Sequence, residues 1–338
     1  MDKWRLFLKK MSLMACYTNR MVQIMCITVF IMFVFQFYKY LQASSPSRQI
    51  ENCNCNLSDN SLDTVALRNK ARIQRLCNTC KNWEKQIEIN FKPKASEYLI
   101  NNRYKLVYCK IFKAASSSWL YNFNLMAGYN TSYINEFITD PMGLIRKKYF
   151  RPSFFELKRA NRVYTSFIIV RHPFERLLSA FKDKLECARD NNKAYRRLRL
   201  LIKKGRRGQN PGAYLRNCTS GPTFFQFITY VIRMAKINRF NEHWEPVWSF
   251  CTPCFFEFDV IAHVETLQED ADYLIKHAKL EDVIKPQWRH KSASQTKDEA
   301  KKYFSELSQS QIKDLYNIYR QDFEMFGYSV DEYLYHQR

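Results

Sequence analysis

Two short segments carry residue types that bind phosphate groups. Residues 113–119 read Lys-Ala-Ala-Ser-Ser-Ser-Trp and follow the apolar run 105–112, and residues 171–180 read Arg-His-Pro-Phe-Glu-Arg-Leu-Leu-Ser-Ala and follow the apolar run 164–170. In each segment we expect a strand to lead into a helix, whose first turn presents free backbone N–H groups to an anion. Two such turns predict a ligand with separated phosphate groups. The candidate binding residues are Lys113, Ala114, Ala115, Ser116, Ser117, Ser118, Arg171 and Ser179.

Each residue type also has an ordinary structural role. Serines 116–118 are preferred helix caps, which is compatible with phosphate contact. Arg171 offers a bidentate fork to a phosphate, or it pairs with a carboxylate such as Asp183 or Glu186. Trp119 is expected to pack in the core against the sheet. Ser179 is a candidate because of its spacing, two helical turns beyond Arg171.

Further segments complete a family pattern. They read Asn-Glu-His-Trp-Glu-Pro at 241–246, Cys-Thr-Pro-Cys at 251–254, Val-Glu-Thr-Leu at 264–267, and a Tyr-rich helix at 316–326. With them the chain resembles Golgi carbohydrate sulfotransferases of the chondroitin/dermatan and natural-killer-epitope type, over roughly residues 100–330. The resemblance implies that the first turn binds the 5′ end of 3′-phosphoadenosine 5′-phosphosulfate (PAPS), and that Arg171 and Ser179 bind its 3′-phosphate. Phe112 departs from the pattern, because most members have Pro there; we expect it to alter the loop entry and to leave the ammonium of Lys113 in place.

The acceptor hydroxyl must lose a proton to a base, and two histidines compete for that role. A histidine titrates in the suitable range. His172 lies inside the second turn, where some family members have Asp, so we interpret it as structural. His243 lies outside both turns and is the favoured catalytic base, next to Trp244, whose ring is able to stack on a sugar. Glu242 and Glu245 are alternative bases or orient the imidazole.

The formal net charge of +22 over 338 residues predicts an acidic partner. Residues 21–38 are nearly all apolar, about the length of a short membrane span, and five cations precede them. The positive-inside rule then orients residues 1–20 to the cytosol. We expect a signal anchor at 21–39, a lumenal stem at 40–100 and a lumenal domain at 101–338, in a single-pass type II Golgi membrane protein. A cleaved signal peptide is the alternative.

The cysteines and sequons fit a lumenal location. Nine of the 11 cysteines follow the expected span and are expected mostly to form disulfides. A zinc site at Cys53, Cys55, Cys77 and Cys80 is the alternative, which the tight first spacing disfavours, so no metal is predicted. Three sequons mark Asn56, Asn130 and Asn217 as glycosylation candidates.

The fold class predicted for 101–338 is α/β, a mainly parallel sheet flanked by helices, in the P-loop-kinase-like sulfotransferase fold that the resemblance implies. Besides the strands at 105–112 and 164–170, we expect a strand at 259–264 and helices at 267–278 and 311–326. The basic run 193–207 is either a solvated surface or a track for a polyanionic glycan.

The resulting hypothesis is a PAPS-dependent carbohydrate O-sulfotransferase. PAPS is a consumed co-substrate and no metal takes part. The resemblance favours the 4-hydroxyl of N-acetylgalactosamine in chondroitin or dermatan as the acceptor, with the Golgi membrane as a further partner and nucleic acid excluded. Two alternatives stay open: a catalytically silent lectin-like binder of acidic glycans, and a P-loop-type kinase, which the lack of a Gly-x-x-x-x-Gly-Lys-Ser/Thr motif disfavours.

Overall fold

The computed structural model describes residues 63–84, 94–137, 140–187, 192–204, 221–284 and 293–334, and the helical residues 31, 32 and 36. The chain divides into two compact units, Met1–Arg48 and Gln49–Arg338, and the elements below belong to the second. Within the described ranges, no helix has both the length and the apolar character that a membrane crossing needs. Apart from residues 31, 32 and 36, the expected span at 21–39 lies outside those ranges.

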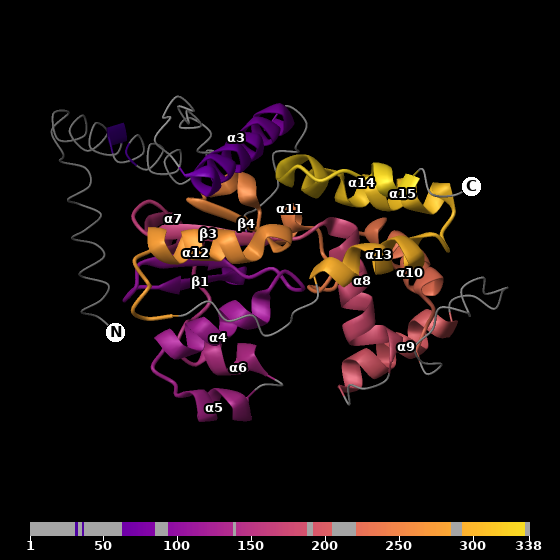
Figure 1. The fold of residues 1–338 in the computed structure, drawn as a ribbon, viewed down its shortest axis with the longest axis horizontal. Helices are drawn as coiled ribbons and strands as arrows, with labels where there is room; N and C mark the ends of the chain where they lie inside the picture. The colour runs from indigo at the N-terminus through magenta and orange to yellow at the C-terminus, as the bar shows by residue number, and fades with distance from the viewer. Residues whose placement is uncertain are drawn as a thin grey trace, which may run out of the picture. The chain divides into compact units, whose positions relative to one another are not determined.

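A mixed four-stranded sheet positions the site (Figure 1). Its order is β1 (Tyr98–Asn101), β2 (Leu106–Cys109), β3 (Thr165–Val170) and β4 (Val260–His263). β1 is antiparallel to β2, whereas β2, β3 and β4 run parallel. All of β2 is buried, as expected for parallel strands covered on both faces. The prediction of a mainly parallel sheet with strands near 105–112, 164–170 and 259–264 is therefore confirmed.

Helices flank the sheet, and Figure 1 shows α4, α5 and α6 grouped together and α8, α9, α10 and α13 gathered at one end of the sheet. Leu267–His277 and Gln309–Phe326 confirm the two helices expected at 267–278 and 311–326. The helices are α3 (Thr64–Glu84), α4 (Ser116–Met126), α5 (Thr131–Glu136), α6 (Pro141–Arg146), α7 (Phe154–Asn161), α8 (Pro173–Phe181), α9 (Lys193–Lys204), α10 (Phe224–Ala235), α11 (Val247–Phe250), α12 (Leu267–His277), α13 (Ala293–Phe304), α14 (Gln309–Phe326) and α15 (Asp331–Leu334), with a π-helical turn η2 (Lys182–Glu186) and 3₁₀ turns η1 (Ala95–Glu97), η4 (Pro253–Phe255) and η5 (Val264–Thr266).

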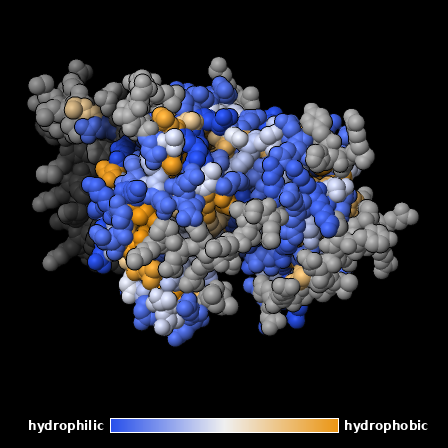
Figure 2. Space-filling view, in the orientation of Figure 1, coloured by the Kyte–Doolittle hydropathy of each residue, from blue (hydrophilic) through white to orange (hydrophobic). Residues whose placement is uncertain are grey.

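Aromatic side chains fill the core against the sheet and between the helices at its end. Trp119 on α4 is buried and packs on Tyr108 of β2 and Phe167 of β3, with ring centroids 6.2 and 4.5 Å away, which confirms its predicted core role. Phe174 on α8 stacks on Phe304 of α13 at 4.6 Å. The visible surface, by contrast, is mostly hydrophilic (Figure 2).

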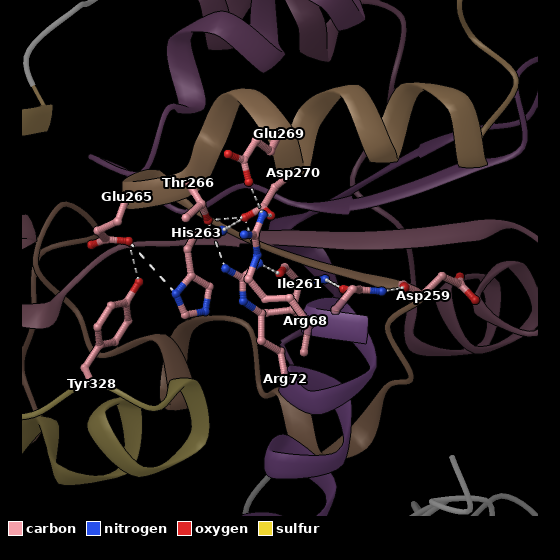
Figure 3. A network of polar contacts seen from close by, with 11 residues as sticks. Arg68, Arg72, Asp259, Ile261, His263, Glu265, Thr266, Glu269, Asp270 and Tyr328 are labelled. Carbon is pink, nitrogen blue, oxygen red and sulfur yellow. Dashed lines mark hydrogen bonds and ion pairs between the residues drawn. The ribbon is translucent and has the colours of Figure 1, made fainter. Parts of the chain in front are cut away.

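Helix α3 covers the open edge of the sheet (Figure 3). The side-chain amide of Asn69 donates to the carbonyl of Asp259 at 2.7 Å and accepts from the backbone N–H of Ile261 at 2.9 Å, as a neighbouring strand would. Arg72 donates to the carbonyl of Ile261 at 3.0 Å and pairs with Asp270 of α12 at 2.7 Å. Part of the stretch expected to be a stem is thus packed on the sheet, and it satisfies backbone groups that an edge strand otherwise exposes.

Disulfides fasten these layers. Cys80 of α3 is bonded to Cys254, and Cys109 at the end of β2 is bonded to Cys251, across 174 and 142 residues of sequence. Cys77 and Cys187 are disulfide-bonded as well. Cys77 and Cys80, half of the alternative zinc set, are therefore engaged in disulfides. By restricting the unfolded chain, a disulfide contributes about 2–4 kcal/mol.

Candidate functional site

The parallel pairing of β2 and β3 brings the two predicted turns together. Cys109 lies opposite Ile168, so both strands end at the same edge of the sheet. Arg171, just after β3, donates from Nη1 to the carbonyl of Lys113, just after β2, at 3.4 Å. Ligands of open α/β sheets bind at the carboxyl ends of the strands. The structure therefore brings the two segments together at one edge of the sheet.

The first turn is shaped for close approach of an anion. Lys113 and Ala115 have left-handed φ values of 67° and 54°, a conformation that costs free energy in residues other than glycine. Ala115 is the N-cap of α4, and its methyl group cannot accept a hydrogen bond. The interpretation of serines 116–118 as caps is therefore wrong, because they form the first turn of the helix itself. Backbone N–H groups at such an uncapped N-terminus are suited to a phosphate.

The ammonium of Lys113 is held by an acidic residue from η2. Its Nζ lies 3.2 Å from Oδ2 of Asp183, and Lys184 approaches the same oxygen at 3.2 Å. Burial lowers the pKa of Lys113, while Asp183 opposes that shift. Two cations share one carboxylate here, so positive charge remains for an anionic ligand.

The second turn presents Arg171 almost fully buried. Its Nε lies 3.6 Å from Glu175, one turn into α8, so the nearby carboxylate is Glu175 rather than Asp183 or Glu186. Burial raises the pKa of Glu175, although Arg171 opposes that shift. Nε of Arg171 is buried without a hydrogen bond in the described structure. Ser179 lies half-buried on α8, and among the described residues its hydroxyl has no hydrogen-bond partner.

Both ring nitrogens of His172 form hydrogen bonds with the backbone. Nδ1 accepts from the backbone N–H of Phe174 at 3.3 Å, which makes His172 the N-cap of α8. Nε2 then donates to the carbonyl of Ser329 at 3.0 Å. Burial lowers the pKa of His172 to about 4, so the ring is neutral. These contacts support the interpretation of His172 as structural.

His243 is positioned differently and lies next to the first turn. Its ring packs at a tilt of 35° against Phe112, the neighbour of Lys113, with centroids 4.3 Å apart. Oδ1 of Asn241 accepts from the backbone N–H of His243 at 3.0 Å and lies 2.9 Å from Nδ1, so we assign the proton to Nδ1. The hydroxyl of Tyr195 on α9 also lies 2.8 Å from Nδ1. In the described part of the chain both ring contacts fall on Nδ1, which leaves the lone pair of Nε2 for a proton.

The electrostatics of His243 keep it neutral. Burial first, and then the charges of Lys184 and Lys113, lower its pKa to about 3. Glu242 lies 3.8 Å from Nδ1 and is exposed, whereas Glu245 accepts from Ser249 at 2.8 Å and pairs with Lys94. Of the two carboxylates proposed as helpers, Glu242 is therefore the one that faces the imidazole.

The prediction that Trp244 offers its ring to a sugar is wrong. Trp244 is 1% exposed and packs edge-on against Phe227 of α10, with centroids 5.2 Å apart. Its carbonyl accepts from Tyr319 of α14 at 2.6 Å. The residue anchors the His243 loop to the core instead of contacting a ligand.

Sequence reasoning missed three residues that arrange this site. Arg176 of α8 is 1% exposed and donates to the carbonyls of Phe112 at 3.5 Å, His243 at 3.4 Å and Glu245. Asn241 and Tyr195 hold the imidazole. Arg176 follows Arg171 by five residues, which was a usable signal, whereas the approach of Tyr195 depends on how α9 packs.

The remaining predicted residues lie at the periphery. Asn130 is exposed and caps α5 by accepting from Tyr133 at 2.8 Å. Asn56 and Asn217 lie outside the described residues. Of the basic run 193–207, residues 193–204 form α9, which exposes Arg196 and Arg197 and turns Tyr195 inward. Within the described ranges, no group of His, Cys, Asp and Glu is arranged to hold a metal ion.

Comparison with known proteins gives consistent matches. Residues 96–329 match the profile of the Sulfotransferase family. Carbohydrate sulfotransferase 11 of Rattus norvegicus is 26% identical over 287 residues, covering 81% of this chain and 79% of that protein. Carbohydrate sulfotransferase 10 of Gallus gallus is 31% identical over 248 residues, covering 69% and 66%. Carbohydrate sulfotransferase 9 of Homo sapiens is 30% identical over 245 residues, covering 70% and 54%. No solved structure matches the chain significantly.

Proposed function

This chain belongs to the Sulfotransferase family and is a carbohydrate O-sulfotransferase, and on that premise we propose that it transfers the sulfuryl group of PAPS to a hydroxyl of an acidic glycan. The observation that carries the proposal is the meeting of two anion-binding turns at one sheet edge, with His243 against the first of them. PAPS supplies an activated sulfuryl group on a nucleotide that carries a second, distant phosphate. The fold is, on this proposal, of the P-loop-kinase-like sulfotransferase type.

The residues present fit such a nucleotide. The uncapped N-terminus of α4, with the small residues 114–118, suits the 5′ end, and Arg171 with Ser179 suits the 3′-phosphate. The almost fully buried guanidinium of Arg171 offers a bidentate fork to a phosphate, and the Glu175 carboxylate 3.6 Å from Nε is its neighbour on α8. Lys113 stabilises the oxygen that becomes anionic as the sulfuryl group departs, because the carboxylate that it contacts, Asp183, is shared with Lys184.

His243 acts as the general base in this proposal. Nε2 carries the lone pair, and Asn241 and Tyr195 hold Nδ1, so the ring is oriented before the acceptor arrives. Because Lys113 and Lys184 contribute to the low pKa of His243, neutralisation of Lys113 by a bound anion raises that pKa toward the range of an effective base.

The acceptor and the cellular location belong to the same proposal. We assign the 4-hydroxyl of N-acetylgalactosamine in chondroitin or dermatan, which the family pattern in the sequence supports. The basic tail and apolar run 21–38 support a type II Golgi membrane protein, and the disulfides agree with an oxidising lumen. In sealed microsomes, added protease should therefore remove only the short tail; digestion of a C-terminal tag would contradict this topology.

The activity test uses the purified chain, labelled PAPS and a panel of glycans, with chondroitin expected to accept label. Transfer to no glycan would refute the proposal, and glycan binding without transfer would support the lectin-like alternative. Arg171→Ala should weaken binding of the product nucleotide PAP by roughly 10-fold or more, since a charge-assisted contact is worth about 1.5–3 kcal/mol. Arg159→Ala, an exposed arginine on α7, is the matched control and should bind PAP normally.

Lys113→Ala should lower turnover more than PAP affinity, because its charge matters most as the leaving oxygen becomes anionic. Lys147→Ala removes an exposed lysine at the end of α6 and is the control. A Lys113→Ala variant with weakened PAP binding and unchanged turnover would contradict the assigned role.

A further inference from the structure

Lys110 is a buried cation that the site described so far does not use. It follows β2 directly and precedes Lys113 by three residues, and it is 2% exposed. Among the described residues its ammonium has neither a hydrogen-bond acceptor nor an ion-pair partner. The ammonium lies over the ring of Phe112, whose centroid is 3.4 Å from Nζ. Buried lysines are almost always paired, so this arrangement indicates a missing anion.

The charges near Lys110 compensate it only in part. Burial lowers the pKa of Lys110 to about 8, the carboxylates of Glu242 and Glu97 raise it, and Arg146 and Arg151 lower it further. Glu97 is already paired with Arg151 at 3.2 Å. Glu242 is 53% exposed and faces the imidazole of His243. Neither carboxylate lies within ion-pair distance of Lys110, so the ammonium keeps most of its charge available.

Phe112 separates Lys110 from His243. The imidazole centroid lies 4.3 Å from the centroid of Phe112, and the ammonium lies 3.4 Å from it. Groups at these two distances would overlap on one face of the ring, so they lie on opposite faces. A cation and the proposed base are thus held one aromatic ring apart. The Pro that the family pattern places at 112 would offer no such ring.

Lys110 and Lys113 also belong to different surroundings. Lys113 contacts Asp183 of η2, and its carbonyl accepts from Arg171 in the nucleotide turn. The cations near Lys110 come instead from the end of α6 and the segment after it: Arg146 and Arg151 both donate to the carbonyl of Ser96, at 3.0 and 3.2 Å. The surroundings of Lys110 are therefore distinct from the contacts that Lys113 makes with Asp183 and Arg171.

We propose that Lys110 binds an anionic group of the glycan acceptor, a carboxylate or a sulfate ester on a sugar near the one that is sulfated. This inference rests on the proposed sulfotransferase function and adds to it a residue that selects acidic acceptors. The anion pairs with the ammonium across from the imidazole, while the reacting hydroxyl lies at Nε2 of His243. Phe112 fixes the separation of the two positions.

The test compares acceptors that differ only in charge. Lys110→Met removes the charge and keeps the apolar stem, and Lys147→Met removes an exposed lysine that also lies over a phenylalanine, Phe137, at 4.9 Å. The acceptors are unsulfated chondroitin, the same polymer after carboxyl reduction, and the carboxyl-reduced polymer carrying sulfate esters. KM for each acceptor and for PAPS is measured with the full chain.

We expect Lys110→Met to raise KM for a charged acceptor by roughly 10-fold or more, the scale of a lost charge-assisted contact, and to change KM for the neutral polymer and PAPS less than about twofold. A rise confined to chondroitin identifies the carboxylate, and one confined to the sulfated polymer identifies the sulfate ester. Lys147→Met should behave like the wild type. An equal change on charged and neutral polymers, no change at all, or a rise in KM for PAPS would overturn the proposal.

A second measurement uses the unaltered chain, in case the variant does not fold. An amine-acylating reagent should modify Lys110 less when chondroitin is bound than when the carboxyl-reduced polymer is bound, as read by mass spectrometry of the digested chain. Equal protection by charged and neutral polymers would overturn the assignment. Wild-type chain that transfers sulfate to none of the polymers would instead refute the proposed function, which keeps the two failures distinct.

Discussion

Replacing Lys110 by Met should stabilise the folded protein, and the gain should depend on pH. The pKa of Lys110 is about 8 in the folded chain against an ordinary value of 10.5, chiefly because of burial. At about 1.4 kcal/mol for each pKa unit, that difference means that the charged ammonium destabilises the folded state by roughly 3 kcal/mol. The penalty is present in full below pH 8, where both states are charged. Between pH 8 and 10.5 the unfolded chain keeps a proton that the folded chain has lost, so raising the pH stabilises the wild type.

Met does not titrate. The free energy of unfolding of Lys110→Met should therefore exceed that of the wild type by up to about 3 kcal/mol at pH 7 and by little near pH 10.5. At roughly 2–4 °C per kcal/mol for a chain of this size, the melting temperature should rise by about 6–12 °C at pH 7. Scanning calorimetry of both proteins at pH 7 and pH 10 measures the difference. Lys147→Met, which removes an exposed charge, should leave the melting temperature within about 1 °C. A lower melting temperature for Lys110→Met at pH 7 would show that the ammonium is satisfied in the folded protein, and the reasoning would fail.

Three further predictions follow from the site and its supports. His243→Ala should lower turnover by roughly 10²–10⁴-fold and leave PAP affinity, measured by calorimetry, near normal. His172→Ala should instead lower the melting temperature first. Near wild-type turnover in a folded His243→Ala protein would contradict the base assignment. Asn69→Ala should cost about 2–4 kcal/mol in denaturant unfolding, because it leaves two backbone groups of the β4 edge unpaired, and a loss below about 0.5 kcal/mol would refute the edge argument. The acid limb of the kcat profile, which reports the substrate-bound enzyme, should lie at a higher pH than that of the kcat/KM profile. The reason is that bound anions offset the cations that help to hold the pKa of His243 near 3. Coincident limbs would contradict this.

Acid should also weaken the fold through its buried histidines. The pKa values of His172 and His263 fall to about 4 and about 3, in both cases mainly through burial. The unfolded chain binds these protons below the ordinary histidine value of 6.5, and the folded chain does not. Stability is therefore lost as the pH falls from 6.5 toward 4. The direction with pH is the same as for Lys110, because burial lowers the pKa of all three bases.

The sequence predicted the strands and turns because they depend on local signals. Apolar runs followed by small or hydroxyl residues identified β2, β3 and the helix starts after them, and parallel pairing then necessarily placed Lys113 and Arg171 together. The cap position was misjudged because hydroxyl residues are frequent caps, whereas the backbone here turns left-handed at Ala115 and starts the helix one residue earlier.

The failures concern side-chain contacts, most of them between residues far apart in the sequence. The ring of Trp244 was expected to face a sugar, but the bond from Tyr319, 75 residues later, holds its backbone in the core. The pairing of Arg171 with Glu175 depends on α8 beginning at Pro173, which placed the two side chains one turn apart. Tyr195 reaches His243 only because α9 packs beside α10 and η2. Composition and spacing carry no information on the long-range contacts of Trp244 and Tyr195.

The cations around His243 link the two substrate sites to the base. After burial, the pKa of His243 is lowered by Lys184, Lys113 and Lys110, and raised by Asp183. On the proposals above, the nucleotide donor neutralises Lys113 and the acidic acceptor neutralises Lys110. Each pairing removes part of the positive field, so the imidazole becomes a stronger base in steps as the substrates bind. The pKa of His243 is then highest when both substrates are bound. An acceptor without an anionic group does not neutralise Lys110, so it raises this pKa less. Selectivity for acidic glycans would in that case extend from binding to turnover, because the same ammonium that holds the acceptor also sets the proton affinity of the base.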